Sequence, residues 1–223
     1  MKIEVNGIEV QVEHADHYLQ MNDLCAAELG SVWAALEAQY ANYEKLLCYH
    51  QPEIPEAMLA EMGAVLVDDC IEMRADAERF ADAHAHGVVR VGEQTFAAWA
   101  AHHDQCHQDM YWTGERIGRD LSRWAIFALW ANERMAGYLL LAMWHPVEAE
   151  IFCVEAADSA QAEALLTAAA RFASRSARTT VLYMADRQSV SEKAAASVGF
   201  AATGIYKAYK IAASSATARQ PSK

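Results

Sequence analysis

The sequence predicts an α/β protein in which a mixed sheet is covered by helices on both faces. From residue 87 onward, short apolar runs of strand length alternate with segments of helix length. The runs at 124–130 and 135–144 are joined by a short turn, as in an antiparallel hairpin, whereas those at 150–155 and 179–185 are separated by a helix-length segment, as in a crossover. With 54% hydrophobic residues among 223, the chain can bury one good-sized core or two small ones.

The first 86 residues are predicted to form a hairpin followed by helices. Asn6-Gly7 joins two alternating triplets in IEVNGIEV, and both turn residues tolerate a positive φ. Apolar residues recur at helical spacing over residues 20–48, and a second long segment, 56–84, begins just after Pro55, a residue favoured at the start of a helix. The stretch GAVLVDDCIEM inside that second segment is also compatible with a strand.

Residues 87–144 are predicted to hold two helices between strands. A short strand in 87–94 precedes a helix over 95–107, for which Thr95 is the expected N-cap. Thr113 can cap the next helix, GERIGRDLSRW. The two apolar strands WAIFALW and MAGYLLLAMW come after it and complete the antiparallel part of the sheet.

The remaining residues are predicted to alternate strictly between strand and helix. The strand EIFCVE leads into a helix over 159–175, and TTVLYMA, QSVSEKAAASVG and ATGIYKAYKI follow as strand, helix and strand. The small and polar tail is predicted to be disordered. We therefore expect three segments: 1–86, a hairpin with a helical extension; 87–211, the α/β domain; and 212–223, the tail. No internal repeat of 20–50 residues is visible.

Charge and cysteine content narrow the class of protein. The net charge of −12 argues against a nucleic-acid-binding surface and against an anionic membrane. Five cysteines at irregular spacing, with no CxxC, indicate reduced thiols in a cell interior. The N-terminus lacks the apolar run of a signal peptide, and no apolar run is long enough to span a membrane. We expect a cytoplasmic protein.

Three phrases carry a resemblance to a known family. They are MYWTGERIGRDLSRWAIF, which leads into RMAGYLL; VEAADSAQAEALLTAAARFA; and QSVSEKAAASVGFAATGIYKAYKI. Over residues 87–211 they resemble the GNAT-type N-acetyltransferases, with Gly137 in the place of a third-strand glycine and Gly199-Phe200 in the closing phrase. The resemblance implies a mixed, mostly antiparallel twisted sheet flanked by helices. It also implies transfer of an acetyl group from acetyl-CoA to a small-molecule or peptide amine.

The family's phosphate-binding motif is altered in this chain. Backbone N–H groups at the start of a helix face the CoA diphosphate in the motif Q/R-x-x-G-x-G/A. The resemblance places this motif at Ala157, Ala160, Gln161 and Ala162. Alanine at 160 adds a methyl group where the motif has glycine, and Asp158 brings negative charge. Two interpretations stay open: weakened but real binding of acetyl-CoA, or an ordinary turn in which Asp158 or Ser159 caps the helix.

Acetyl transfer needs a donor to the thioester carbonyl and an acceptor for the proton of the amine. By resemblance, the central strand supplies the donor from the backbone N–H of Cys153 or Val154. Glu150 and Glu155 are the carboxylates available on that strand. Each also has a simpler interpretation, Glu150 as a solvated strand end and Glu155 as a partner of the helix dipole.

The acid that protonates the departing thiolate is less well defined. The place of the family's usual tyrosine holds Ala195, whereas Gln188 and Ser191 resemble an N-x-x-S phrase of members that lack this tyrosine. These two residues are therefore counted with the cofactor-binding set. Tyr206 in the final strand is the alternative thiolate donor, although a tyrosine there can equally be packing.

Aromatic and histidine residues complete the candidates. By resemblance, Tyr111 and Trp112 fall in the segment that walls the acceptor pocket, but an aromatic pair also suits a core. His103 and His107 are four residues apart and share a helix face, as metal ligands must. HHDQCH lacks a fourth ligand, so a polar face or pocket lining is favoured and no metal is expected.

Three hypotheses follow from these residues. The favoured one is an acetyl-CoA-dependent N-acetyltransferase. The second is a catalytically degenerate protein of the same fold that binds a ligand or regulates a partner, motivated by the alanines at 157, 160 and 195. The third gives residues 1–86 the role of a helical element that binds a partner or forms a homodimer.

Overall fold

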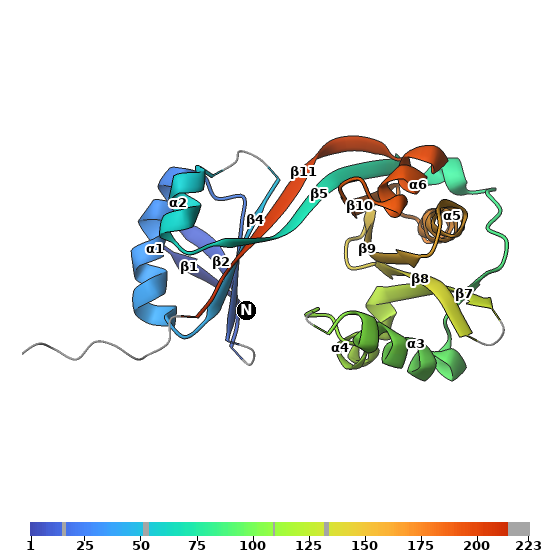
Figure 1. Ribbon diagram of the computed structural model, residues 1–223, viewed down its shortest axis with the longest axis horizontal. Helices are drawn as coiled ribbons and strands as arrows, with labels where there is room; N and C mark the ends of the chain where they lie inside the picture. Colours follow the sequence, from blue (N-terminus) through green and yellow to red (C-terminus); the bar gives the residue numbers. More distant parts are fainter. Residues whose placement is uncertain (15–16, 51–53, 109, 132–133, 214–223) are drawn as a thin grey trace, which may run out of the picture. The chain divides into compact units, whose positions relative to one another are not determined.

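The computed structural model describes residues 1–14, 17–50, 54–108, 110–131 and 134–213 (Figure 1). The chain forms two compact units. Unit 1 comprises Met1–Cys70 and Gly204–Lys223, and unit 2 comprises Ile71–Thr203. The units therefore divide at Cys70–Ile71 and at Thr203–Gly204, whereas the expected segments divide at His86–Gly87. Most of the predicted disordered tail lies outside the described residues.

Unit 1 is built on a βαβ crossover. β1 (Lys2–Val5) and β2 (Ile8–Glu13) form the predicted hairpin, and β2 pairs antiparallel with β3 (Tyr18–Asn22). The helix α1 (Ala26–Tyr40) then returns the chain to β4 (Glu44–Tyr49), which runs parallel to β3. Leu29, Val32 and Leu36 of α1 are fully buried at helical spacing against this sheet. Their apolar stripe explains why a helix forms there.

Two predicted helices in this region are wrong. Residues 20–48 form a strand, a helix and a strand, because the buried run Leu47–Tyr49 is a strand rather than a continuation of the helical stripe. In residues 56–84, the helix α2 (Glu56–Glu61) stops at Gly63, whose φ of +67° ends it. The strand β5 (Val65–Asp76) and the short 3₁₀ helix η1 (Ala77–Phe80) follow, so the strand interpretation of GAVLVDDCIEM is correct.

Unit 2 carries the strands predicted from residue 87 onward. β6 (Val88–Arg90), β7 (Trp124–Ala131), β8 (Arg134–Ala142) and β9 (Glu148–Ala156) pair antiparallel in that order, and β10 (Thr180–Asp186) pairs parallel with β9. The helix α5 (Ser159–Arg175) is the crossover between them, and α6 (Val190–Val198) follows β10. The final strand, β11 (Ala201–Ile211), belongs mostly to unit 1 and pairs antiparallel with β4.

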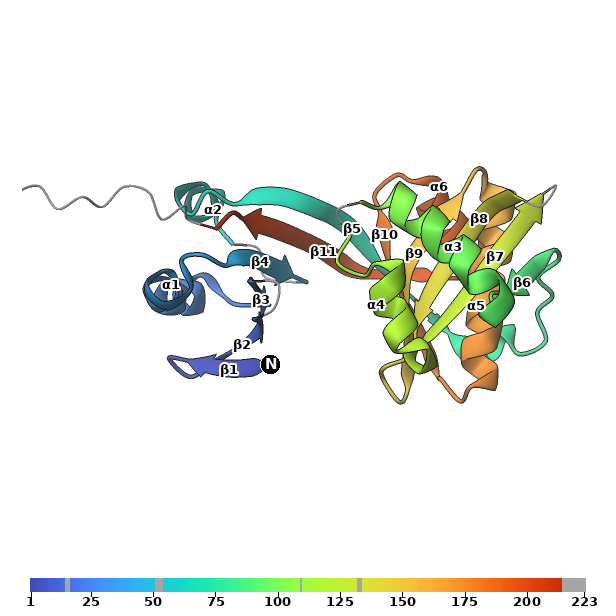
Figure 2. The same cartoon turned by 90° about the horizontal axis from the view of Figure 1, so that it is seen from below.

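Helices cover both faces of the unit 2 sheet, as the sequence predicts. In Figures 1 and 2, α3 (Glu93–Cys106) and α4 (Gly114–Arg119) lie on one face of β7–β9, and α5 lies on the other. A 3₁₀ turn, η2 (Leu121–Arg123), joins α4 to β7. Alternate residues of β8 belong to hydrophobic cores on opposite faces of the sheet. Leu139 and Leu141 pack toward α5, whereas Tyr138 and Leu140 pack toward α3.

The helix caps were partly predicted. Thr113 caps α4 as expected, with its hydroxyl accepting from Arg116 N at 3.3 Å. The N-cap of α3 is Gly92 rather than Thr95. Thr95 lies inside the helix, and its hydroxyl accepts from Gly92 N at 3.1 Å. The helix therefore begins two residues before its predicted start.

The chain contains a repeat that is not visible in the sequence. The series β1–β2–β3–α1–β4–α2–β5 recurs as β7–β8–β9–α5–β10–α6–β11, with the same antiparallel and parallel pairings of its first four strands. Across the described residues the hydrogen-bonded strand order is β1-β2-β3-β4-β11-β5-β10-β9-β8-β7-β6. Each strand of the first series has an equivalent in the second, from β1 with β7 to β5 with β11. If β6 is left out, replacing every strand by its equivalent reverses the order, so the arrangement is symmetric. Each series thus contributes its last strand next to the fourth strand of the other.

Candidate active site

The two parallel strands of unit 2 stop pairing before they end. Their ladder joins Thr180–Tyr183 to Glu148–Ile151, yet β10 continues to Asp186 and β9 to Ala156. At the same point β9 contains a bulge, because Leu140 and Leu141 of β8 oppose Cys153 and Ile151 and leave Phe152 without a partner. Among the described residues, no β10 residue is in register with β9 beyond this point. The strands therefore part here, which is what a site between them requires.

The equivalent strands of unit 1 do not part. The register of β3 with β4 runs without a shift to the last residue of β3, where Asn22 opposes Cys48. Asp23 N then donates to Cys48 O at 2.8 Å, and His50 N donates to the Asp23 carboxylate at 2.7 Å. These bonds close the junction that corresponds to the opening in unit 2.

The first turn of α5 faces the end of β9. Asp158 is the N-cap, and its carboxylate accepts from Gln161 N at 2.8 Å. The Gln161 side-chain oxygen accepts from Ala157 N at 3.1 Å. The N–H groups of Ser159 and Ala160 have no preceding helical carbonyl to bond, and both residues are exposed. Two backbone donors are therefore left at this helix start, next to an acidic cap.

The four predicted motif residues lie at this turn but in different surroundings. Ala157 and Ala160 are exposed, and Gln161 is half-buried. The methyl group of Ala160 thus fills no buried space. Ala162 is fully buried in the core between α5 and the sheet, and its N–H bonds to Asp158 O at 3.1 Å. Ala162 packs the helix rather than offering a ligand contact.

A polar cluster lies where α3 meets the end of β9. His102 Nε2 is 2.9 Å from one oxygen of Glu155 and 3.7 Å from Cys106 Sγ. His107 Nε2 is 4.0 Å from the other Glu155 oxygen and 3.6 Å from Cys153 Sγ. That second oxygen is buried and has no hydrogen-bond partner. The cluster combines a carboxylate, two imidazoles and two thiols beside the parted strands.

Burial keeps several of these groups neutral. It raises the pKa of the Cys153 thiol to about 12, so this thiol is not a nucleophile. Burial, and next the neighbouring His103, lowers the pKa of His107, so its ring is uncharged at neutral pH. Glu155 is the carboxylate that these neutral groups surround.

A buried series of hydrogen bonds through His103 lies next to the cluster. His103 is fully buried, with Nε2 at 2.7 Å from Trp112 O and Nδ1 at 2.7 Å from Tyr138 Oη. Because a carbonyl only accepts, Nε2 must carry the proton, and the Tyr138 hydroxyl donates to Nδ1. Burial raises the pKa of Tyr138, which keeps it a donor. These hydrogen bonds anchor the segment after α3 to β8. The sequence did not suggest this role for His103.

The predicted acceptor wall is an aromatic cluster. Trp112 packs with Trp124, Trp144 and Phe152, with ring centroids 4.9–6.5 Å apart. At these separations the rings fill the space between them. Glu150 lies at the edge of this cluster, where its carboxylate accepts from Trp144 Nε1 at 3.3 Å.

Other predicted residues lie apart from the cluster. The Tyr111 ring is exposed and lies 3.9 Å from the Arg116 guanidinium carbon. Val154 packs toward the α5 core. Gln188 and Ser191 flank the start of α6. Gln188 has a φ of +62° and donates its N–H to the Glu192 carboxylate. The Ser191 hydroxyl is hydrogen-bonded to the Ser189 hydroxyl at 3.0 Å. Tyr206 belongs to unit 1, where its hydroxyl donates to Cys48 Sγ at 3.2 Å.

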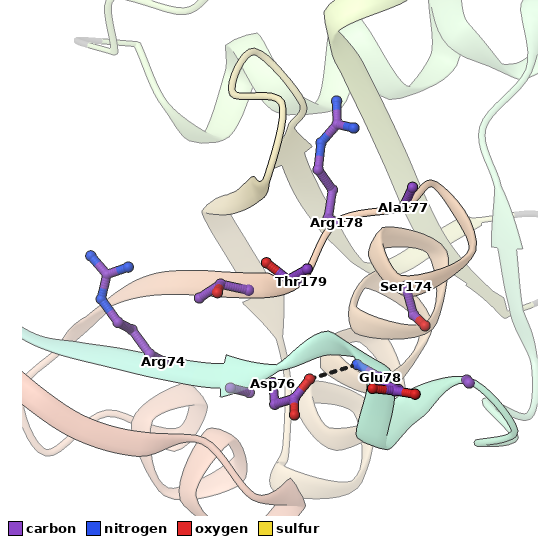
Figure 3. A pocket seen from close by; sticks show the side chains of 10 residues that line it. Arg74, Asp76, Glu78, Ser174, Ala177, Arg178 and Thr179 are labelled. Atoms are coloured by element: carbon purple, nitrogen blue, oxygen red, sulfur yellow. Dashed lines mark hydrogen bonds between the residues drawn. The ribbon is translucent and has the colours of Figure 1, made fainter.

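A hollow of about 880 Å³ in unit 2 lies at the opposite end of β10, where the strand begins at Thr180 (Figure 3). Two arginines line it, but Arg74 pairs with Glu72 and Glu148, and Arg178 donates to backbone carbonyls. In Figure 3 both guanidinium groups extend away from Asp76. This hollow is separate from the opening between β9 and β10. Arg74 is paired there with carboxylates, whereas Arg178 donates to backbone carbonyls and its buried Nε has no hydrogen-bond partner among the described residues.

Comparison with known proteins places this geometry in a fold family. A Staphylococcus epidermidis protein described as functionally unknown has a TM-score of 0.69 at 11% identity, covering 95% of this chain and 93% of that one. A GCN5-related N-acetyltransferase from Kribbella flavida has a TM-score of 0.65 at 11% identity, covering 95% and 89%. The chain has the fold of the GNAT-type N-acetyltransferases. No family model and no curated protein matches the sequence.

A third solved structure shares this fold. A tandem GNAT protein from the clavulanic acid biosynthesis pathway matches with a TM-score of 0.53 at 14% identity, covering 91% of this chain and 77% of that one. The three matches cover 91–95% of this chain, so they extend over most of unit 1 as well as unit 2. Among the described residues, no helix is both long and apolar enough to cross a bilayer.

Proposed function

We propose that the chain transfers an acyl group, with acetyl as the first choice, from a CoA thioester to an amine. The observation that carries this proposal is the parting of β9 and β10 after Ile151 and Tyr183, at a bulge in β9. An extended thioester arm needs such a gap, because its amides can then bond the strand edge that β10 leaves unpaired.

The residues at the helix start fit the anionic end of CoA, with one opposing feature. The N–H groups of Ser159 and Ala160 remain as donors at the positive end of the α5 dipole. The carboxylate of Asp158 opposes them, because it occupies the same turn and repels phosphate. We expect CoA to bind, but more weakly than the donor geometry alone would permit.

The chain's own residues supply two parts of the reaction. The backbone N–H of Cys153 or Val154, at the bulge, donates to the carbonyl oxygen of the acyl group. Glu155 accepts the proton that the amine loses as its nitrogen forms a bond to the carbonyl carbon. The bond from that carbon to sulfur breaks, and the thiolate takes a proton from water. His102 and His107 lie beside the two Glu155 oxygens and are themselves partly exposed, so they give the proton a route to solvent.

The acceptor is a small-molecule or peptide amine. The net charge of −12 favours encounter with a cationic acceptor through long-range attraction. The aromatic rings around Trp112 pack against one another beside Glu150, so they leave no space between them for an amine. The acceptor must therefore approach from the side of the cluster that Glu155 faces.

Two measurements on the full-length protein test this proposal. Calorimetry with CoA reports binding, and release of free thiol from acetyl-CoA in the presence of an amine panel reports transfer. Glu155→Gln should leave CoA binding intact and lower the rate at least about 100-fold. Glu115→Gln, an exposed position on α4, is the matched control. Absence of CoA binding would overturn the proposal.

A second candidate is a GNAT-fold protein that binds a ligand without turnover. The capping of α5 by Asp158 and the bond from Ala157 N to Gln161 favour it, because both occupy the turn without a phosphate. It predicts that CoA binds, or fails to bind, with no thiol release for any amine. Thiol release that Glu155→Gln removes would exclude it.

A further inference from the structure

The polar cluster of unit 2 contains a set of metal ligands. His102 and Cys106 are one turn apart on α3 and therefore project from the same face of the helix. Glu155 reaches them from β9, 53 residues away in the sequence from His102. The ligand atoms of these three residues all lie within 4.8 Å of one another. The sequence pattern HHDQCH alone could not reveal Glu155 as a ligand, because Glu155 lies on another element.

The separations are close to those of a tetrahedral metal site. With metal–ligand bonds of about 2.0–2.3 Å, the donor atoms of a zinc site lie roughly 3.3–3.6 Å apart. Here the His102 nitrogen is 2.9 Å from the Glu155 oxygen and 3.7 Å from the Cys106 sulfur. Small rotations of three side chains would bring all donors onto one ion. Three protein ligands leave a fourth position for water, as in open zinc sites.

Hydrogen bonding alone leaves part of the cluster unexplained. The bond between His102 and Glu155 uses one carboxylate oxygen, while the other is buried without a hydrogen-bond partner. This second oxygen lies 4.0 Å from His107 Nε2, and a cation bound to the same carboxylate would offset part of the cost of burying it. The His102 and Glu155 side chains are 29% and 34% exposed, and Cys106 is exposed, so an ion can enter from solvent.

We propose that His102, Cys106 and Glu155 bind a divalent transition-metal ion of the zinc class. A thiolate with an imidazole selects Zn²⁺ or Co²⁺ over Mg²⁺ and Ca²⁺, which prefer oxygen ligands alone. Binding of the ion does not depend on acyl transfer. If the proposed function holds, the ion takes Glu155 out of proton transfer, so Zn²⁺ inhibits and a chelator restores activity.

The test uses Co²⁺ as a spectroscopic probe on the full-length, chelator-treated protein. We expect one equivalent to bind with visible bands of tetrahedral Co²⁺ and a near-ultraviolet thiolate-to-metal band. Cys106→Ser should remove the thiolate band, and His102→Asn and Glu155→Gln should each weaken Zn²⁺ binding at least about 30-fold by calorimetry. The double variant His84→Asn with His86→Asn, at exposed positions outside the cluster, should bind normally.

Two results would overturn the proposal. One is the absence of saturable Co²⁺ binding. The other is unchanged Zn²⁺ affinity in both His102→Asn and Cys106→Ser when their metal-free thermal unfolding matches that of the parent. Because the readout is spectroscopic, the metal site stands if the Co²⁺ bands appear and no amine is acylated. If CoA and an amine react but no metal binds, the metal-site proposal is wrong and the proposed acyl transfer is unaffected.

Discussion

The acidic cap of α5 makes a specific prediction about CoA affinity. Asp158→Asn keeps a side-chain oxygen for the Gln161 N–H, since asparagine caps a helix about as well as aspartate. It removes one negative charge from the turn that would hold the diphosphate. At a separation of about 5 Å in water, one charge repels two phosphate charges by ~1.7 kcal/mol, and 0.15 M salt roughly halves this. The variant should therefore bind CoA about fourfold more tightly.

Calorimetry with CoA on both proteins measures the difference. Asp82→Asn, which makes the same charge change at another exposed position in unit 2, should leave the affinity within about twofold. Raising the salt to 1 M should remove most of the advantage, because screening acts on the repulsion itself. An Asp158→Asn protein that binds CoA no better than the parent at low salt would show that the diphosphate does not lie at this helix start.

Three further changes test the support of the site. Gly137→Ala would place a Cβ 2.6 Å from a backbone carbonyl oxygen of β9 and should cost about 1–3 kcal/mol in urea unfolding. Gly30→Ala, inside α1, meets only a methionine methyl group at 3.6 Å and should not destabilise the protein. Tyr138→Phe leaves the buried Nδ1 of His103 without its donor and should cost about 1–3 kcal/mol by the same assay. Alkylation of Cys106, followed by peptide mass spectrometry, should slow in the presence of Zn²⁺; equal rates would contradict metal ligation.

The sequence predicted most of unit 2 because its strands and helices differ in length and are separated by clear breaks. The hairpin of β7 and β8 and the crossover from β9 through α5 to β10 are all in their predicted places. Unit 1 was harder because strand and helix signals adjoin with little between them. Leu46–Tyr49 continues the apolar spacing of α1 although it is a strand, and periodicity alone cannot separate the two.

The candidate site was predicted only where its residues are neighbours in the sequence. The junction of β9 with α5, with Asp158 as a possible cap, was identified because strand, turn and helix follow one another. The contact of His102 with Glu155 joins two elements that the sequence separates by 53 residues. The burial of His103 beneath Tyr138 was likewise hidden, because a histidine beside charged residues gives the same pattern as a solvated helix face.

Because the element series is repeated, the proposed function could involve one CoA site per chain or two. Both series have a strand–helix–strand crossover. In the described residues, β9 has a bulge and continues beyond its ladder with β10, whereas β3 shows neither feature beside β4. β3 has five residues and stays in register with β4 to its end, and Asp23 then bonds both Cys48 O and the His50 N–H. Opening that junction would leave these groups unpaired, at about 1–3 kcal/mol each. We therefore expect calorimetry to give one CoA per chain, and a stoichiometry of two would show that a closed ladder is no barrier to this ligand.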